Sequence, residues 1–195
     1  MIRGPLRVFR WPTIIYMRNL LTNLALCVAL PFTLDTAGEA YAKTVVASTS
    51  PLPDFSIIQP EHARAYISKI YPYALKVQEE KAVPVAITLA IACLESGYGS
   101  SHYAQTRHNH FGIRVYKNGK AGYRRFSSLD ECFDYYTQLF SMERYAPLQE
   151  VAFGDLPAFV QGLQDCGFNH RDKYRKKLLH LIDFLRLEEL TASMA

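Results

Sequence analysis

The chain has 195 residues, of which 49% are hydrophobic and 13% aromatic, so it can bury one sizeable core. Its 22 Lys and Arg against 18 Asp and Glu give a net charge of +4, and four of the Arg residues lie in the first 20 positions. Without residues 1–42 there are 18 basic and 16 acidic residues, a balance of +2. This average does not indicate a nucleic-acid partner and permits only weak attraction to an anionic polymer.

The first 42 residues have the features of an export signal. Met17-Arg18-Asn19 provides a short basic start, residues 20–34 are moderately apolar, and Ala40-Tyr41-Ala42 fits a small-x-small cleavage site. The apolar run is interrupted and is shorter than the roughly 20 residues of a membrane span, which disfavours an uncleaved anchor. We therefore expect residues 1–42 (17–42 if translation starts at Met17) to be removed. The remainder is expected in the periplasm, the cell envelope or the extracellular space, with no membrane span.

The next segments are expected to be a linker and one folded domain. Residues 43–59 are rich in Ser, Thr and Pro and lack periodicity, which is typical of a linker. The domain is expected over 60–188, with a tail over 189–195. Apolar residues recur at helical spacing after Pro60, and we expect a break or kink in that helix at Pro72.

A central helix and a β-hairpin follow. Pro84 suits the first turn of a helix that continues to about Glu95 and is apolar on nearly every side. The runs 111–116 and 121–126 flank Asn118-Gly119, which is the strongest short-range hairpin signal.

Three further helices complete the predicted fold. Ser128 and Glu131 form a capping box that begins a helix, and Asp155 caps another helix that ends at Gly167. The last helix is expected over 171–186. The predicted fold class is mainly α (α+β), with five or so helices and one small inserted hairpin.

Export would place three cysteines in an oxidising compartment, where at most one intramolecular pair can form. Cys93 lies within an apolar helix and is expected to be a small buried side chain. We expect the disulfide to join Cys132 and Cys166. The sequence contains no Cys-x-x-Cys motif, and nothing in it indicates thiol catalysis.

Three histidines cluster in the sequence without forming a ligand pattern. His102, His108 and His110 lack the i, i+4 spacing of a helical site, and no acidic or Cys ligand lies nearby in the sequence. Zinc sites use three or four such ligands. We therefore expect no metal and no cofactor.

The sequence Leu94-Glu95-Ser96-Gly97-Tyr98-Gly99 places one carboxylate where the buried helix ends and a Gly-rich turn begins. Burial and the negative end of the helix dipole both disfavour the charged form of Glu95 and raise its pKa. A carboxyl group protonated near neutral pH is suited to general acid catalysis. A structural Glu that hydrogen-bonds the turn amides is the alternative.

The order of motifs resembles the bacterial peptidoglycan N-acetylglucosaminidases, the glucosaminidase-domain family (glycoside hydrolase family 73-like) that includes flagellar rod-cap hydrolases and autolysins. The resemblance spans roughly residues 60–186 and is carried by residues 84–99, 109–113, 123–126 and 143–145. It implies a lysozyme-like, mostly helical domain with a small β-lobe over a sugar groove. It also implies that Glu95 is the general acid that protonates the glycosidic oxygen after N-acetylglucosamine.

The second catalytic group is open. Many members of the family have an acidic residue in the β-lobe, whereas this chain has no Asp or Glu between Ser96 and Leu129. Capping and solvation explain the carboxylates of the following helix, which leaves Glu143 as the best carboxylate candidate. The substrate's own 2-acetamido group could act instead, with a tyrosine polarising it.

The identity of that tyrosine is also open. Family members often have Gly-Tyr-Ala-Thr where this chain has Gly167-Phe168-Asn169-His170. Tyr145, in the family's Arg-Tyr position, is then the best candidate, and a buried aromatic is its alternative.

Aromatic rings near Glu95 are expected to bind sugar faces. Asn109 could bind an acetamido group or hold its loop through an Asx turn. The expected substrate-binding residues are Tyr98, Asn109, Tyr116, Tyr123 and Phe126.

The leading interpretation is an exported, monomeric peptidoglycan hydrolase that cleaves after N-acetylglucosamine, with glycan strands as its partner and no nucleic acid. One alternative is a lytic transglycosylase that uses Glu95 alone. The other is a non-catalytic protein of peptidoglycan binding or assembly.

Overall fold

A computed structural model describes residues 53–117, 119–152, 154–169 and 171–192. The expected signal peptide and most of the expected linker therefore lie outside the described residues. Within the described part, no helix combines the length and apolarity needed to cross a membrane.

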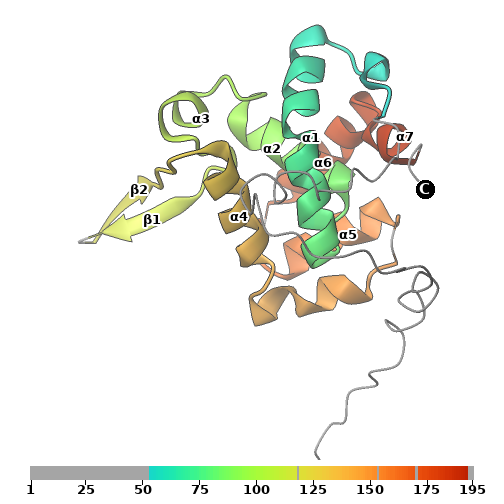
Figure 1. Ribbon diagram of the computed structural model, residues 1–195. Coiled ribbons are helices and arrows are strands. Elements are labelled where there is room, and N and C mark those ends of the chain that lie inside the picture. The colour runs from blue at the N-terminus through green and yellow to red at the C-terminus, as the bar shows by residue number, and fades with distance from the viewer. Residues whose placement is uncertain (1–52, 118, 153, 170, 193–195) are drawn as a thin grey trace, which may run out of the picture. The chain divides into compact units, whose positions relative to one another are not determined.

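The described residues form a mainly helical domain with one small antiparallel sheet, as the sequence predicts (Figure 1). The α-helices are α1 (Glu61–Lys81), α2 (Val85–Ser96), α3 (His102–Arg107), α4 (Leu129–Leu139), α5 (Leu156–Asp165), α6 (Asp172–Phe184) and α7 (Leu187–Ala192). The 3-10 helices are η1 (Phe55–Ile57) and η2 (Glu143–Glu150), and the strands are β1 (Arg114–Lys117) and β2 (Lys120–Tyr123).

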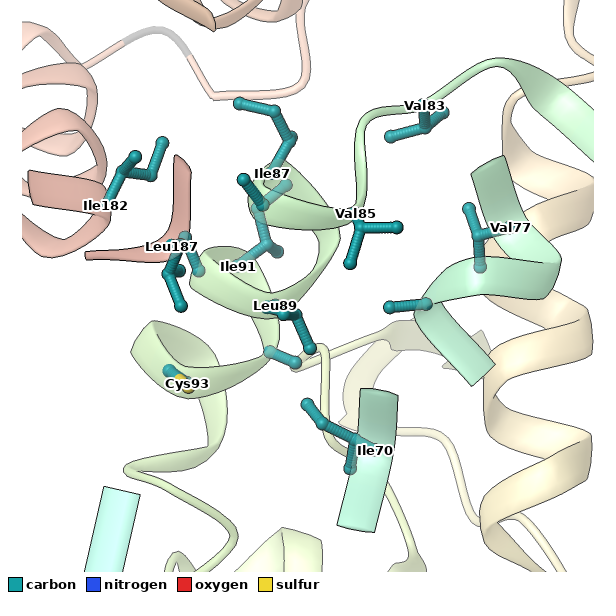
Figure 2. Close-up of a cluster of buried hydrophobic side chains, with 14 of the residues drawn as sticks. Ile70, Val77, Val83, Val85, Ile87, Leu89, Ile91, Cys93, Ile182 and Leu187 are labelled. Carbon is teal, nitrogen blue, oxygen red and sulfur yellow. The ribbon is translucent and has the colours of Figure 1, made fainter. Parts of the chain in front are cut away.

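Helix α2 is the centre of the core, and ten of its twelve residues are buried. Figure 2 shows its side chains between Ile70 and Val77 of α1 on one side and Ile182 and Leu187 of α6 and α7 on the other. Burying one Ile or Leu contributes roughly 1.5–3 kcal/mol, whereas helix propensities differ by at most about 0.7 kcal/mol for ordinary residues. Packing therefore contributes more than helix propensity to this apolar helix, and Glu95 is one of its two residues left unburied.

Of the break or kink expected at Pro72, the break is wrong, because helix α1 continues through this residue. Pro72 lies on the exposed face, where its ring meets solvent, while Tyr71 and Ala74 beside it are buried. The packing of this inner face compensates for the hydrogen bond that proline cannot make. Beyond the helix, the Gln78 side chain accepts a hydrogen bond from the Val85 amide at 3.0 Å and so ties α1 to the start of α2.

The predicted hairpin is confirmed. Arg114 pairs with Tyr123 and Lys117 with Lys120, and the two strands project away from the helices (Figure 1). The buried Asn109 side chain closes the base of the hairpin: its amide donates to the carbonyls of Ile113 and Arg124 at 2.8 and 2.9 Å, and its oxygen accepts from the Ile113 amide at 2.8 Å.

The caps of the later helices agree with the sequence analysis, but the C-terminal end differs. Ser128 and Asp155 accept hydrogen bonds from the first turns of α4 and α5. The last helix stops at Phe184, and a separate helix, α7, begins at Leu187 and continues into the expected tail. Leu187 and Leu190 are buried against the core, which explains why this segment is ordered as a helix.

The expected Cys132–Cys166 disulfide is not formed, since both residues carry free thiols. The Cys132 sulfur is buried and accepts hydrogen bonds from the backbone amides of His110 and Phe111. Cys166 follows α5 and is half-buried. The Cys132 thiol therefore stabilises the backbone of the loop before the hairpin.

Candidate active site

Glu95 lies in the last turn of α2, where the chain reverses. Gly97, Tyr98 and Gly99 all adopt positive φ angles, of 57°, 56° and 75°. The left-handed conformation costs a non-glycine residue roughly 1–2 kcal/mol, and the Tyr98 ring packs edge-on against His62 at 5.0 Å. This reversal ends the buried helix and leaves the Glu95 side chain exposed.

Ser96 fixes the turn from inside. Its hydroxyl donates to the Ala92 carbonyl at 2.6 Å, accepts from the Gly99 amide at 2.7 Å and lies 3.1 Å from the Tyr66 hydroxyl. A Cβ atom on Gly99 would lie only 2.7 Å from the Tyr66 ring, so glycine is required at that position.

A buried Tyr–His pair supports Ser96. The Tyr66 hydroxyl lies 2.8 Å from Nδ1 of His110, and both side chains are 7% exposed. Burial, with smaller contributions from Lys69 and His108, lowers the pKa of His110 to about 4. His110 is therefore neutral near pH 7, and it belongs to the scaffold of the turn.

Gly112 brings the base of the hairpin against Glu95. It has a φ of +63°, and a Cβ atom at this position would lie 3.2 Å from Oε2 of Glu95. The preceding residue, Phe111, is anchored by stacking on Tyr136 with ring centroids 3.8 Å apart. The carboxyl group of Glu95 thus lies between the end of α2 and the base of the hairpin.

The surroundings of Glu95 favour its protonated form. Although the residue is exposed, the protein around its carboxyl group removes enough solvent to raise its pKa. The buried hydroxyl of Tyr174, on α6, opposes part of this rise by stabilising the carboxylate. That hydroxyl has no hydrogen bond of standard geometry among the described residues, so its influence on Glu95 acts through proximity.

The position of Tyr174 beside Glu95 was not predicted from the sequence. The Tyr174 ring lies 6.3 Å from that of Phe168, the residue that replaces the family's tyrosine. A phenol group thus lies next to Glu95, but it comes from Tyr174 on α6 and not from the position that holds tyrosine in the family. The signal that could have found it is the single hydroxyl on an otherwise apolar helix face.

Several predicted site residues lie in the core or have structural roles. Tyr145 is 2% exposed and packs against Phe140 and Phe168. Phe126 is also 2% exposed. The Asn109 amide group is saturated by the hairpin backbone, which supports the loop role over acetamido binding.

Other predicted residues are accessible. Glu143 is exposed at the start of η2, and within the described residues it has no hydrogen bond or ion pair that joins it to Glu95. Tyr98 and Tyr123 are half-buried, and Tyr116 on β1 is 76% exposed.

No group of three His, Cys, Asp or Glu side chains in the described ranges is placed to hold a metal ion. One cavity of about 360 Å³ lies between α1, the start of α2 and α7, and another of about 420 Å³ lies between α5, α6 and α7. Glu95 is absent from both linings.

Comparison with known proteins identifies the domain. The sequence model of the Glucosaminidase family, described as mannosyl-glycoprotein endo-beta-N-acetylglucosaminidase, matches residues 71–187. Exo-glucosaminidase LytG of Bacillus subtilis is 24% identical over 88% of this chain and 67% of its own length. Peptidoglycan hydrolase FlgJ of Vibrio cholerae is 26% identical over 75% of this chain and 52% of its own length. The chain thus spans about two thirds and one half of these relatives.

Solved structures agree. The peptidoglycan hydrolase of Sphingomonas sp. A1 is 28% identical, with a TM-score of 0.55 over 67% of this chain and 95% of that one. A truncated glycoside hydrolase domain of Salmonella typhimurium FlgJ is 25% identical, with a TM-score of 0.51 over 64% and 98%. With Glu95 at the end of a buried helix beside a small β-lobe, the chain belongs to the Glucosaminidase family and is a glycoside hydrolase.

Proposed function

We propose that this protein is an exported peptidoglycan hydrolase that cleaves the glycosidic bond after N-acetylglucosamine, with Glu95 as the general acid. The names of the relatives support peptidoglycan as the substrate, since FlgJ and the Sphingomonas enzyme are called peptidoglycan hydrolases. The observation that carries the role of Glu95 is its position: an accessible carboxyl group with a raised pKa, held between α2 and Gly112.

In the first step, protonated Glu95 donates its proton to the glycosidic oxygen as the bond from that oxygen to the anomeric carbon breaks. The carboxylate formed is stabilised by the nearby Tyr174 hydroxyl. Glu95 can then accept a proton from the water that attacks the anomeric carbon, which restores the acid. The surroundings that raise the pKa of Glu95 favour proton donation in the first step. The Tyr174 hydroxyl stabilises the carboxylate that accepts a proton in the second step.

The substrate's acetamido group is the proposed partner of Glu95. Its oxygen would bond to the anomeric carbon while the leaving oxygen takes the proton, and water would then open the cyclic intermediate. This choice is supported by the lack of Asp and Glu in residues 97–128. Tyr145 is too deeply buried to support its proposed role in polarising the amide.

A lytic transglycosylase is the second candidate, because that reaction also uses a single acid and Glu95 is the one carboxyl group identified in the site. The two candidates differ in the bond cleaved and in the chemistry of the new end. A non-catalytic binding protein is disfavoured by the raised pKa and the accessibility of Glu95.

The assignment of the acid can be tested with paired variants on purified peptidoglycan. Glu95→Gln should lower the rate of glycan cleavage by at least about 100-fold, because the amide cannot donate the proton. Glu143→Gln is the matched control: it removes an exposed carboxylate and should keep most of the activity. Wild-type rates in a folded Glu95→Gln protein would contradict the assignment.

A further inference from the structure

Charge is strongly segregated in this domain. The β-lobe, defined here as residues 97–128, contains six Lys and Arg and no Asp or Glu. The rest of residues 53–192 contains 11 basic and 16 acidic residues. A nearly balanced total therefore conceals a lobe of +6 attached to a body of −5, a field that attracts anions to one end of the molecule.

The hydrogen bonds of two lobe cations do not compensate their positive charge. Arg107 donates to the Tyr123 carbonyl at 2.7 Å and Arg125 to the Thr106 carbonyl at 2.6 Å, and both acceptors are neutral. In the described residues, the ion pairs join α1 to itself and to α4, or lie between Arg186 and Glu189. Arg124 packs on the Tyr135 ring and interacts electrostatically with the carboxylate of Glu131, and among the described side chains no ion pair involves a cation of the lobe.

Aromatic rings hold part of this surface in place. Tyr103 of α3 stacks on Tyr123 of β2 with centroids 4.1 Å apart. The guanidinium groups of Arg107 and Arg114 lie over these rings at 5.4 and 5.5 Å. Such cation–π contacts position Arg without neutralising it. The exposed Arg114 and Lys120 side chains extend the positive surface along the hairpin.

The lobe begins at the catalytic acid. Gly112 lies against the Glu95 carboxyl group, and Arg114 is two residues farther along the chain. A strand of four residues covers about 13 Å. A glycan strand with its scissile bond at Glu95 must therefore lie next to the base of the lobe, within reach of its cations.

On the basis of the proposed function, we propose that the β-lobe binds the carboxylates of the peptide stems on the glycan, so that the enzyme prefers glycan whose stems carry free carboxylates to glycan whose stems are neutral. The sugars of the glycan backbone are mostly uncharged, whereas each peptide stem carries free carboxylates. A lobe with six cations and no carboxylate of its own suits that chemistry.

Binding by the inactive Glu95→Gln protein tests this proposal without turnover. Sacculi free of teichoic acid would be used either intact or after carbodiimide coupling to ammonia has converted their carboxylates into amides, and the bound fraction would be measured by pelleting. We expect about fivefold weaker binding to the amidated sacculi, as two or three exposed ion pairs would give. The difference should vanish in about 1 M salt, where the screening length is about 3 Å. Equal binding to both substrates at low salt would overturn the proposal.

Charge-matched double variants locate the effect. Arg114→Gln/Lys120→Gln, in the Glu95→Gln background, should lose the preference for intact sacculi. Lys81→Gln/Lys176→Gln removes the same charge from the body and should keep it, while an equal loss in both would overturn the role of the lobe. Circular dichroism would check the fold of each variant.

Turnover by the unmodified enzyme separates this proposal from the proposed function. Equal hydrolysis of intact and amidated sacculi would contradict the lobe proposal and leave the hydrolase assignment intact. No product from either substrate would contradict the hydrolase assignment, and the binding comparison would still decide the role of the lobe.

Discussion

Gly112 and Glu95 approach so closely that a Cβ atom on Gly112 would lie 3.2 Å from Oε2 of the carboxyl group. This contact joins the end of the buried helix α2 to the base of the hairpin. It limits the positions open to the carboxyl group and helps to exclude solvent from one side of it. The acid is therefore positioned by two segments that are 17 residues apart in the sequence.

Gly112→Ala should lower kcat by about tenfold or more, because even a displacement of about 1 Å in a catalytic group is costly. The positive φ of +63° adds roughly 1–2 kcal/mol of backbone strain. Gly154→Ala is the control, since Gly154 also has a positive φ but no atom within 4 Å of its Cβ position. Steady-state kinetics and denaturation should show that both variants lose stability and that Gly112→Ala alone loses activity. Equal activity in the two would contradict the role of the contact.

Tyr174→Phe should move the alkaline limb of the kcat/KM pH profile to higher pH. The Tyr174 hydroxyl stabilises the Glu95 carboxylate, so its removal raises the pKa of Glu95 further and keeps the acid protonated to higher pH. Tyr73→Phe, on the α1 face that packs against Phe133, is the matched control and should leave the limb in place. A limb unchanged in Tyr174→Phe would show that Tyr174 does not influence the acid.

The Tyr66 and Ser96 hydroxyls should act as one unit. Tyr66→Phe and Ser96→Ala each remove a buried hydrogen-bonding group, at a cost of about 1–3 kcal/mol of folding stability. Because both hold the turn after Glu95, each should lower kcat more than it changes KM. The double variant should lose less than the two single losses combined. Independent, additive effects on kcat would contradict a shared network.

His110 should make the protein less stable in mild acid. Its pKa is about 4 in the folded protein, against 6.5 without the fold, so the unfolded chain takes up a proton first as the pH falls. The stability that comes from keeping His110 neutral is fully present above pH 6.5 and is lost progressively down to about pH 4. The free energy of unfolding decreases by about 3 kcal/mol over this range.

Urea denaturation across this range would measure the effect. His110→Asn, which keeps a neutral acceptor for Tyr66, should show a smaller fall in the free energy of unfolding. His180→Asn, at an exposed position, should behave like the wild type. The same slope in all three proteins would contradict a buried, neutral His110.

The features that depend on short sequence signals were predicted correctly. The hairpin followed from Asn118-Gly119, the caps from Ser128 and Asp155, and the position of Glu95 from the end of one apolar run. Helix α7 was missed because it is short and is ordered by burial against other elements.

The surroundings of the acid depend on contacts between distant segments. Tyr174 reaches Glu95 from a helix about 80 residues later, and Tyr66 reaches His110 across 44 residues. No spacing rule within one helix or strand encodes such contacts. For the same reason Tyr145 and Phe126, placed near the substrate by motif, are in the core.

The most direct test of the account is mass spectrometry of the muropeptides released when the purified protein, residues 43–195, digests peptidoglycan. We expect products with N-acetylglucosamine at the new reducing end, which requires hydrolysis after that sugar. Anhydro-muramyl ends would contradict hydrolysis and assign a lytic transglycosylase. No release of products by a folded protein that still pellets with the wall would contradict catalysis altogether.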